Sequence, residues 1–334
     1  MGKQDNVFGI YAASGKLSVA AYKGKTLMTD WVDVPTNIVQ NGEILSKNLL
    51  ISFLKDTLKK YHLKTKKAVF IISGDRVLTK TVTMPMMSNE QIRYNIPFEF
   101  RDLIKGELKD YIYDYAYRPP LEKSEGDDAE EKKIDLLAVA IPAAFYENLE
   151  ECVARAGLKL VVSTPDLCMM EQILGLYETE EERLKERCLL DIGIDRCKMQ
   201  IYKNGRYKLS HVIDIGENYI VRTIADEMNV DMELARTYIR TNYEDCLNMP
   251  AAVNAYKDIS LEVLKGFNYY EMSDMSSRLN DVVLYGGGAM IGPLVDILKE
   301  RIDKNVLTMS ETFPQYNTNE DLDITIVAIG ALLG

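Results

Sequence analysis

Apolar and polar residues alternate along the first part of the chain in a pattern typical of a small β-sheet. Residues 7–36 divide into three short strands, the last two joined as a hairpin by the turn at Lys23-Gly24-Lys25. Residues 42–63 then carry apolar residues at helical spacing and predict a long amphipathic helix. The segment at 66–73, with its continuous apolar run, indicates a strand buried inside a sheet. The chain is therefore predicted to begin with an α/β domain.

The pattern then changes and predicts a separate small unit at residues 85–165. A helix is expected from Ser88, followed by strands at 110–120 and 133–142. The charged run at 121–133 lacks core-forming residues, so we expect a solvated, mobile loop there. A further helix and strand follow before the first pattern returns. This segment is thus predicted to form an inserted α+β unit.

Residues 187–216 repeat the opening arrangement of strand, turn, strand and hairpin. Superposing the two copies at a constant offset of 180 residues places Tyr11 opposite Asp191 and Ala13 opposite Gly193. The shared layout favours an internal duplication over a chance match. The chain is therefore expected to contain two related α/β halves, with the small unit inserted into the first.

The overall composition narrows the class of protein. A chain of 334 residues exceeds what one hydrophobic core usually serves, which favours two domains. The formal net charge of −11 argues against a nucleic-acid partner, because a phosphate backbone demands clustered lysine and arginine. No signal peptide precedes Val7 and no apolar run approaches the ~18 residues of a membrane span. We therefore expect a cytoplasmic protein without direct membrane insertion.

Cysteine and histidine offer little chemistry in this sequence. The five cysteines are scattered and lack metal-binding spacing, so we expect reduced, buried thiols rather than disulfides or zinc. The two histidines, His62 and His211, are expected to be structural. This composition argues against a histidine-centred hydrolase or metal site.

Asp191 and Gly193 occupy the turn of the second copy. An apolar strand delivers Asp191 to its end, and Gly193 lets backbone amides approach an anion closely. A carboxylate in this place can hold a magnesium-bound water beside nucleotide phosphates, which makes Asp191 the one candidate catalytic residue. A plain turn without a ligand is the alternative.

A second candidate site is the run Gly286-Gly287-Gly288, between an apolar strand and a helix. Three glycines there permit close backbone approach to a ligand, and a helix N-terminus favours anions. The segment is neither a dinucleotide-binding fingerprint nor a Walker A loop. A tight junction that needs small residues is the structural alternative.

Two residue pairs near the end of the chain raise similar questions. Glu262 and Lys265 lie three residues apart on a predicted helix. Such residues usually form a surface ion pair, although in a nucleotide cleft they could reach a ribose. Ala328 and Gly330 are predicted at the start of the last helix, where small side chains let two elements pack closely.

The order of these segments resembles that of the actin-like ATPase superfamily, with two phosphate segments, an inserted unit, a triple-glycine adenosine segment and a final A-x-G helix. Within it the chain looks like the PilM family of the type IV pilus inner-membrane platform, with the division protein FtsA as a close relative. The matching stretches are "MPMMSNEQIRYNIPFEF", "ARAGLKLVVSTPDLCMMEQIL", "LEVLKGFNYY" and "GGGAMIGPLVDIL". They place Glu99 and Asp166 at acidic family positions, whereas Phe98 replaces a tryptophan.

The resemblance implies a ribonuclease H-like, duplicated two-domain α/β fold with a small α+β subdomain inserted in the first half. It assigns residues 1–84 and 166–186 to the first domain (1A), 85–165 to the inserted subdomain (1C-like) and 187–334 to the second domain, with a 2B part at about 217–260. It also implies a site for ATP and magnesium, with Asp191 holding the metal through water. The implied nucleotide contacts are Asp191, Gly193, Glu262, Lys265, Gly286, Gly287 and Gly288, with Ser14 and Gly15 in the first turn.

The chain also departs from the family pattern where phosphate would bind. Tyr11 and Ala13 replace the aspartate and glycine of the first phosphate segment, and Glu217 replaces the second of two paired glycines. These changes are expected to weaken Mg-ATP binding and hydrolysis more than the fold, and the cofactor could be absent altogether. Whether Gly15 or Lys16 partly compensates for the lost aspartate and glycine stays open.

The first hypothesis for function is a scaffold or adaptor without enzymatic activity. By resemblance, the N-terminal cytoplasmic tail of a single-span, PilN-like inner-membrane protein would recruit the chain to the membrane. In relatives that tail docks against the inserted subdomain and the domain beneath it, so residues 85–165 are the expected partner surface. Self-association is a further option. The alternatives are an ATP-binding switch or ATPase of the same fold, or an FtsA-like division protein. A sugar or acetate kinase is disfavoured, because no catalytic carboxylate is evident near the first phosphate segment.

Overall fold

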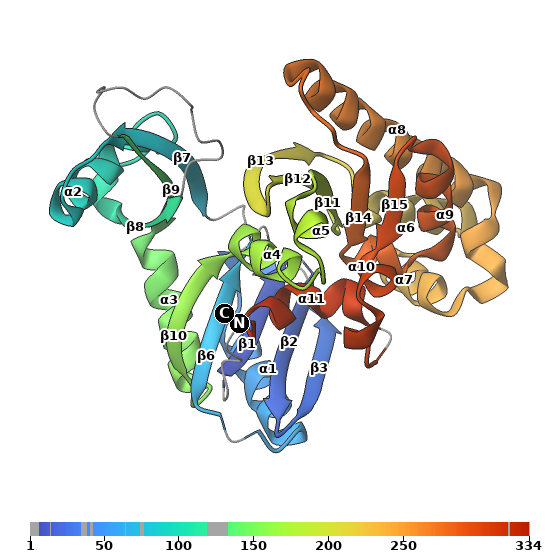
Figure 1. Ribbon diagram of the computed structural model, residues 1–334. Helices are drawn as coiled ribbons and strands as arrows, with labels where there is room; N and C mark the ends of the chain where they lie inside the picture. Colours follow the sequence, from blue (N-terminus) through green and yellow to red (C-terminus); the bar gives the residue numbers. More distant parts are fainter. Residues whose placement is uncertain are drawn as a thin grey trace.

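The computed structural model describes residues 7–13, 15–34, 39–40, 43–63, 65–73, 77–118, 133–319 and 321–333. Apart from Lys133, the predicted charged loop lies outside the described residues, as does the predicted phosphate contact Ser14. Figure 1 shows two sheet-based halves next to each other, with the inserted unit standing away from both.

The first half is built on a five-stranded sheet formed by the apolar runs that open the chain. The strands are β1 (Val7–Ala13), β2 (Lys16–Lys23), β3 (Thr26–Asp33), β6 (Lys67–Ile72) and β10 (Lys159–Pro165). Their order is β10-β6-β1-β2-β3, in which β1, β2 and β3 pair antiparallel and β6 and β10 run parallel to β1. Helices α1 (Lys47–Lys60) and α3 (Ala143–Arg155) bury their apolar sides against this sheet.

The helix predicted at 42–63 is shorter in the structure. Glu43–Ile44 (β5) pairs with Val39–Gln40 (β4) as a short hairpin, so these residues are not available to the helix. Ser46 then takes an extended backbone, with φ −128° and ψ 94°, and α1 begins after it.

The inserted unit is a three-stranded antiparallel sheet with one covering helix. Its elements are β7 (Leu78–Pro85), α2 (Asn89–Glu99), η1 (Leu108–Asp110), β8 (Tyr111–Arg118) and β9 (Lys133–Pro142), and the strand order is β7-β9-β8. α2 starts at a capping box in which Ser88 and Gln91 exchange hydrogen bonds. Ile92 and Ile96 of this helix are buried against the sheet.

The strand pairing corrects the predicted bounds of this unit, 85–165. Its first strand begins at Leu78, so residues 78–84 belong to the insertion. At the other end β10 pairs with β6, and α3 buries Leu149 and Val153 in the core of the first domain. Residues 143–165 therefore belong to the first domain, because their apolar side matches its sheet.

The second half repeats the first sheet strand for strand. The strands are β11 (Arg187–Ile192), β12 (Cys197–Lys203), β13 (Arg206–Ile213), β14 (Asp281–Tyr285) and β15 (Asn305–Thr308). Their order, β13-β12-β11-β14-β15, has the same antiparallel and parallel pairs as the first sheet. Tyr11 faces Ser18 in the first copy and Asp191 faces Lys198 in the second, so both strands keep the 180-residue offset. The predicted duplication is confirmed.

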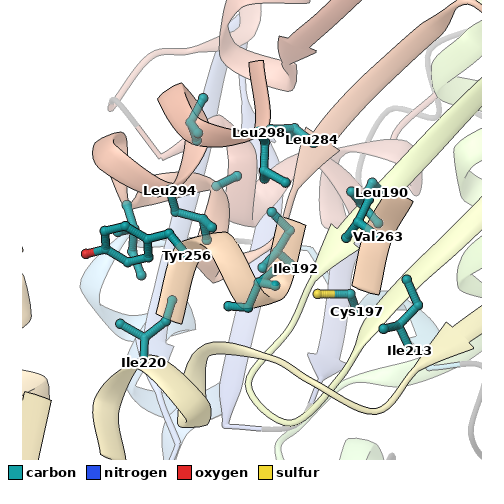
Figure 2. Close-up of a cluster of buried hydrophobic side chains, with 14 of the residues drawn as sticks. Leu190, Ile192, Cys197, Ile213, Ile220, Tyr256, Val263, Leu284, Leu294 and Leu298 are labelled. Carbon is teal, nitrogen blue, oxygen red and sulfur yellow. The ribbon is translucent and has the colours of Figure 1, made fainter. Parts of the chain in front are cut away.

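Helices pack on the second sheet and share one large apolar cluster with it. They are α6 (Glu217–Met228), α7 (Met232–Thr241), η2 (Tyr243–Asn248), α8 (Pro250–Ser273), η3 (Gly287–Met290) and α9 (Gly292–Arg301). Figure 2 shows part of this cluster, where Leu190 of β11, Val263 of α8 and Leu294 of α9 are buried together. Within the described residues the cluster extends into the helices at 217–260, so the expected 2B part shares its core with the rest of the second domain.

Each half contributes one helix that packs on the other half. α4 (Asp166–Leu174) follows the first sheet but contacts the second, where the Tyr202 hydroxyl donates to the backbone oxygen of Leu167 at 3.1 Å. α11 (Leu322–Gly330) follows the second sheet but packs on β1 and β2, and all nine of its residues are buried. Figure 1 shows α11 lying across these strands, near α4. The remaining short helices are α5 (Glu180–Leu184), α10 (Met309–Thr312) and η4 (Pro314–Tyr316).

Ala328 and Gly330 lie at the end of α11 rather than at its start, which corrects the prediction for this helix. The close packing expected of them is present. A Cβ on Gly9 of β1 would stand 2.4 Å from the backbone oxygen of Ala328, and one on Gly330 would stand 3.0 Å from the Cβ of Met169 in α4. Small residues therefore allow α11 to pack closely on β1 and on α4.

Candidate functional site

The two turns related by the duplication face each other across a cleft between the halves. Gly15, in the β1–β2 turn, has a φ of +67°, and a Cβ there would stand 2.0 Å from Cδ1 of Ile194 in the β11–β12 turn. Both the backbone conformation and this contact therefore require glycine. Gly286 and Gly287, from the triple-glycine segment, line the same cleft. The first turn, the second turn and the triple glycine thus come together.

Asp191 lies at the end of β11, against the triple glycine. Gly286 has a φ of +87°, and a Cβ on it would stand 2.4 Å from Oδ1 of Asp191. Gly193 donates its backbone N–H to the oxygen of Arg196 at 3.0 Å, which closes the β11–β12 turn. Of the predicted nucleotide contacts, Asp191, Gly193, Gly286 and Gly287 therefore line one cleft.

An ion pair crosses this cleft from one half to the other. Lys16 Nζ, at the start of β2, donates to Oε1 and Oε2 of Glu217 at 3.1 and 3.0 Å. Both side chains lie on Gly287, where a Cβ would stand 2.0 Å from Glu217 Oε1 and 2.2 Å from Lys16 Nζ. The position at which the resemblance implies a second glycine thus holds a carboxylate with its own cation.

The first amides of α6 already have acceptors within the chain. The backbone N–H groups of Glu217 and Asn218 donate to the oxygens of Gly193 and Ile194, at 2.9 and 2.7 Å. The first amides of a helix are the groups that most readily bind phosphate. These two amides instead hold the β11–β12 turn against the helix.

A buried network holds the second lysine of the cleft. Lys198 of β12 pairs with the fully buried carboxylate of Asp166, at the start of α4. Gln200 Nε2 donates to Oδ1 of Asp166 at 3.5 Å, and Gln200 Oε1 accepts from the Tyr285 hydroxyl at 3.2 Å. Burial raises the pKa of Tyr285 well above its usual value, so its phenol stays protonated and donates. The network ties α4 of the first half to the second sheet.

All five cysteines are free thiols, as predicted, and four of them are buried. Burial raises the pKa of the Cys197 thiol, next to the cleft, and raises that of Cys168 to about 12. Because the thiolate is the reactive form, these groups are poor nucleophiles at neutral pH. The thiols therefore add no chemistry to the cleft.

Four of the predicted contacts in the described part of the chain do not line the cleft: Gly15, which packs against Ile194, and three others. Glu262 and Lys265 of α8 pair with each other at 2.6 Å on the surface, with 40% and 60% of their side chains exposed. Gly288 packs against Ile192, since a Cβ on it would stand 2.1 Å from Cγ2 of that side chain. A role for these residues in ligand binding stays a prediction.

Other residues of the cleft are harder to recognise from the sequence. Nothing in it indicates that Lys16 and Glu217 meet, because they are 201 positions apart. Lys198 leaves a weak signal as a polar residue inside the apolar strand β12. Ser18 leaves none, yet its buried hydroxyl lines the cleft without a hydrogen-bond partner in the described part of the structure.

The Lys16–Glu217 pair divides the cleft. On the side of Asp191 the cavity measures about 80 Å³, and on the side of Trp31 and Arg236 it measures about 340 Å³. Small-molecule sites usually measure roughly 300–1,000 Å³. Among the described residues, no three histidine, cysteine or acidic side chains cluster as metal ligands. At about 80 Å³, the Asp191 side of the cleft, as it stands, is smaller than the usual small-molecule site.

A separate groove lies between the inserted unit and the first domain. It measures about 360 Å³ and is bordered by β8 and β10, each the edge strand of its sheet. Ile112, Val161 and Val162 line it and are each at least 40% exposed. Asp114 is the one charged residue among the described residues that line it. Ser163 lines it too, and its buried hydroxyl has no hydrogen-bond partner in the described part of the chain.

Two sheets of identical order, joined by a cleft with facing turns and a glycine-rich third wall, define the fold of the actin-like ATPases. A family model described as type IV pilus assembly protein PilM matches residues 17–325. The chain belongs to this PilM family. Within the described residues, every helix falls short of the length or the hydrophobicity that crossing a bilayer requires.

Solved structures agree on the fold. The PilM-PilN type IV pilus biogenesis complex is similar with a TM-score of 0.80 and 17% identity, over 98% of this chain and 97% of that one. The ethanolamine utilization protein EutJ from Carboxydothermus hydrogenoformans has a TM-score of 0.59 and 12% identity, over 97% and 89%. MreB5 of Spiroplasma citri bound to ADP has a TM-score of 0.52 and 12% identity, over 99% and 96%.

A curated relative supports the same superfamily. Cell division protein FtsA of Neisseria meningitidis serogroup B is 26% identical over 153 residues, which are 45% of this chain and 34% of FtsA. The matched part thus spans about a third of the length of FtsA.

Proposed function

We propose that this protein is a cytoplasmic adaptor of a type IV pilus, or of a related secretion machine, and that it acts by binding rather than by catalysis. Its partner would be the N-terminal cytoplasmic tail of a PilN-like, single-span protein, which recruits it to the inner membrane. The similarity to the PilM-PilN complex supports a partner of this kind. The net charge of −11 disfavours nucleic acid, and self-association is compatible with this role.

The groove between β8 and β10 carries this proposal. Edge strands offer backbone groups to which an extended peptide can add as a further strand. Ile112, Val161 and Val162 provide apolar walls for alternate side chains of such a peptide. The Ser163 hydroxyl and the Asp114 carboxylate then offer a polar group and a charge to fix its register. An extended tail with apolar anchors and one cationic group suits this groove.

We further propose that ATP hydrolysis by this protein is weak or lost. Tyr11, at the position of the family aspartate, is buried in the apolar cluster between the halves. Glu217 places a negative charge on Gly287, where phosphates would have to lie. The alternative is an ATP-binding switch or ATPase, since MreB5 of the same fold is bound to ADP. A division role like that of FtsA is a further alternative.

Replacing Ile112 by arginine is expected to weaken binding of the tail by about thirtyfold or more, because a buried apolar contact is lost and a charge is desolvated. Binding is measured by calorimetry with a synthetic peptide of the N-terminal tail of the neighbouring PilN-like protein. Leu261→Arg is the matched control, since Leu261 is 45% exposed on α8, away from the groove. The proposal fails if the tail does not bind the wild type, or binds Ile112→Arg as tightly.

Replacing Asp191 by alanine is expected to leave the rate of phosphate release from Mg-ATP unchanged, because the wild type is expected to release phosphate only at the background rate. A phosphate-release assay with a no-protein control measures both rates. A wild-type turnover that Asp191→Ala abolishes would instead establish an ATPase with Asp191 at its centre.

A further inference from the structure

The ion pair between Lys16 and Glu217 joins the two halves where three turns meet. We propose that it is a built-in latch, which holds the halves together without a nucleotide and occupies the place of the phosphates. This inference goes beyond the adaptor role and does not depend on what the groove at β8 and β10 binds.

The geometry is that of a strong, specific contact. Lys16 belongs to the first sheet and Glu217 to the first turn of α6 in the second half, and the lysine contacts both carboxylate oxygens. Their side chains are only 14% and 11% exposed, so solvent and salt screen the pair far less than a surface pair. The positive end of the 12-residue helix α6 also favours a carboxylate at its first residue.

Neighbouring charges extend the latch along the cleft. Asp33 of β3 lies 3.9 Å from Lys16 Nζ and also pairs with Arg240 of α7. Positive and negative groups therefore alternate from Arg240 through Asp33 and Lys16 to Glu217. This chain of charges crosses between the halves twice, because Arg240 and Glu217 belong to the second half and the other two to the first.

The same pair stands in the way of a nucleotide. Lys16 and Glu217 form the wall shared by the cavities of about 80 and 340 Å³. A ligand that extends from the larger cavity to Asp191 must therefore separate them. A phosphate would also meet the carboxylate of Glu217 on Gly287, and like charges at this distance repel. The ion pair that closes the halves and a bound polyphosphate therefore cannot occupy this position at the same time.

Opening of the cleft is measured by hydrogen exchange of the backbone amides in the β1–β2 turn, in the β11–β12 turn and at 286–288. Glu217→Gln and Lys16→Met are each expected to speed exchange there by about tenfold or more, because each removes one charge of the partly buried pair. Lys16→Arg keeps the cation, so its backbone amides at the cleft are expected to exchange at the wild-type rate. Amides of α9, which packs against α8 and β15, report whether each variant remains folded.

Glu262→Gln is the matched control, since it breaks the exposed pair with Lys265 within one helix. It is expected to leave exchange at the cleft unchanged. The latch is refuted if Glu217→Gln and Lys16→Met both remain folded and exchange at the cleft as slowly as the wild type. If both variants unfold, Lys16→Arg decides: wild-type exchange supports the latch, and accelerated exchange overturns it.

Calorimetry with Mg-ATP as the probe tests the second part of the inference. Glu217→Gln is expected to bind Mg-ATP at least about tenfold more tightly than the wild type, because the competing carboxylate charge is removed. Equal or weaker binding by Glu217→Gln would overturn the claim that Glu217 occupies the phosphate position. Neither experiment uses the tail peptide, so failure of the latch and failure of the adaptor role are distinguishable.

Discussion

Replacing Gly216 by alanine is expected to lower the free energy of unfolding by about 3 kcal/mol. A Cβ at this position would stand 2.5 Å from the oxygen of Gly193, 2.6 Å from the nitrogen of Arg196 and 2.8 Å from the carbonyl carbon of Asp195. All three are backbone atoms of the β11–β12 turn, which cannot move aside as a flexible side chain would. The turn and the start of α6 must therefore separate.

Urea unfolding followed by circular dichroism measures the loss. Gly292→Ala is the matched control, because a Cβ on Gly292, at the start of α9, meets nothing within 4 Å. That change is expected to stay within about 0.5 kcal/mol of the wild type. Equal stability of the two variants would contradict the contact between Gly216 and the turn.

Replacing Asp166 by alanine is expected to cost about 3–5 kcal/mol in the free energy of unfolding. Asp166 is fully buried and pairs with Lys198, whose side chain is only 15% exposed. Removing the carboxylate leaves the lysine charge in the interface between α4 and the second sheet without this partner. The backbone N–H of Leu167, which donates to Oδ1 of Asp166 at 2.7 Å, also loses its acceptor.

The double variant Asp166→Ala with Lys198→Met separates charge from packing. It is expected to be less destabilised than the sum of the two single changes, because the desolvated charge is removed with its partner. Glu151→Ala is the exposed control: Glu151 pairs with Lys47 at 2.6 Å, but 47% of its side chain is exposed, so its loss of stability is expected to be far smaller than that of Asp166→Ala. Additive single changes would contradict a direct pair between Asp166 and Lys198.

The sheets and the duplication could be predicted because they leave local signals. Strands β1 to β3 and β11 to β13 each show a two-residue period or an apolar run, and these patterns repeat at a constant offset. The glycines of the cleft are also predictable, since Gly15 and Gly286 need a backbone conformation that other residues rarely adopt.

The remaining features depend on which surfaces meet, and a local pattern carries no such information. The apolar side of α3 fits an inserted unit as well as the first domain, so the predicted boundary at 165 was too late. Glu262 and Lys265 have the spacing of a cleft pair and of a surface pair alike, and the structure places them on the surface. Lys16 and Glu217 lie 201 positions apart, and no local pattern in either segment predicts that they contact each other.

The packing of one helix from each half on the other half has a consequence for biosynthesis. The ribosome makes β1 about 300 residues before α11, yet Val7 and Ala20 of the first sheet lie in one cluster with Ile326 and Ile329 of that helix. Until α11 has emerged, this face of the nascent first half lacks its cover and presents an apolar surface to chaperones. A cut between the halves would likewise leave each fragment with a helix whose docking surface is on the other. Such a protein becomes native only as a whole, so any partner meets a finished subunit and no half-folded one.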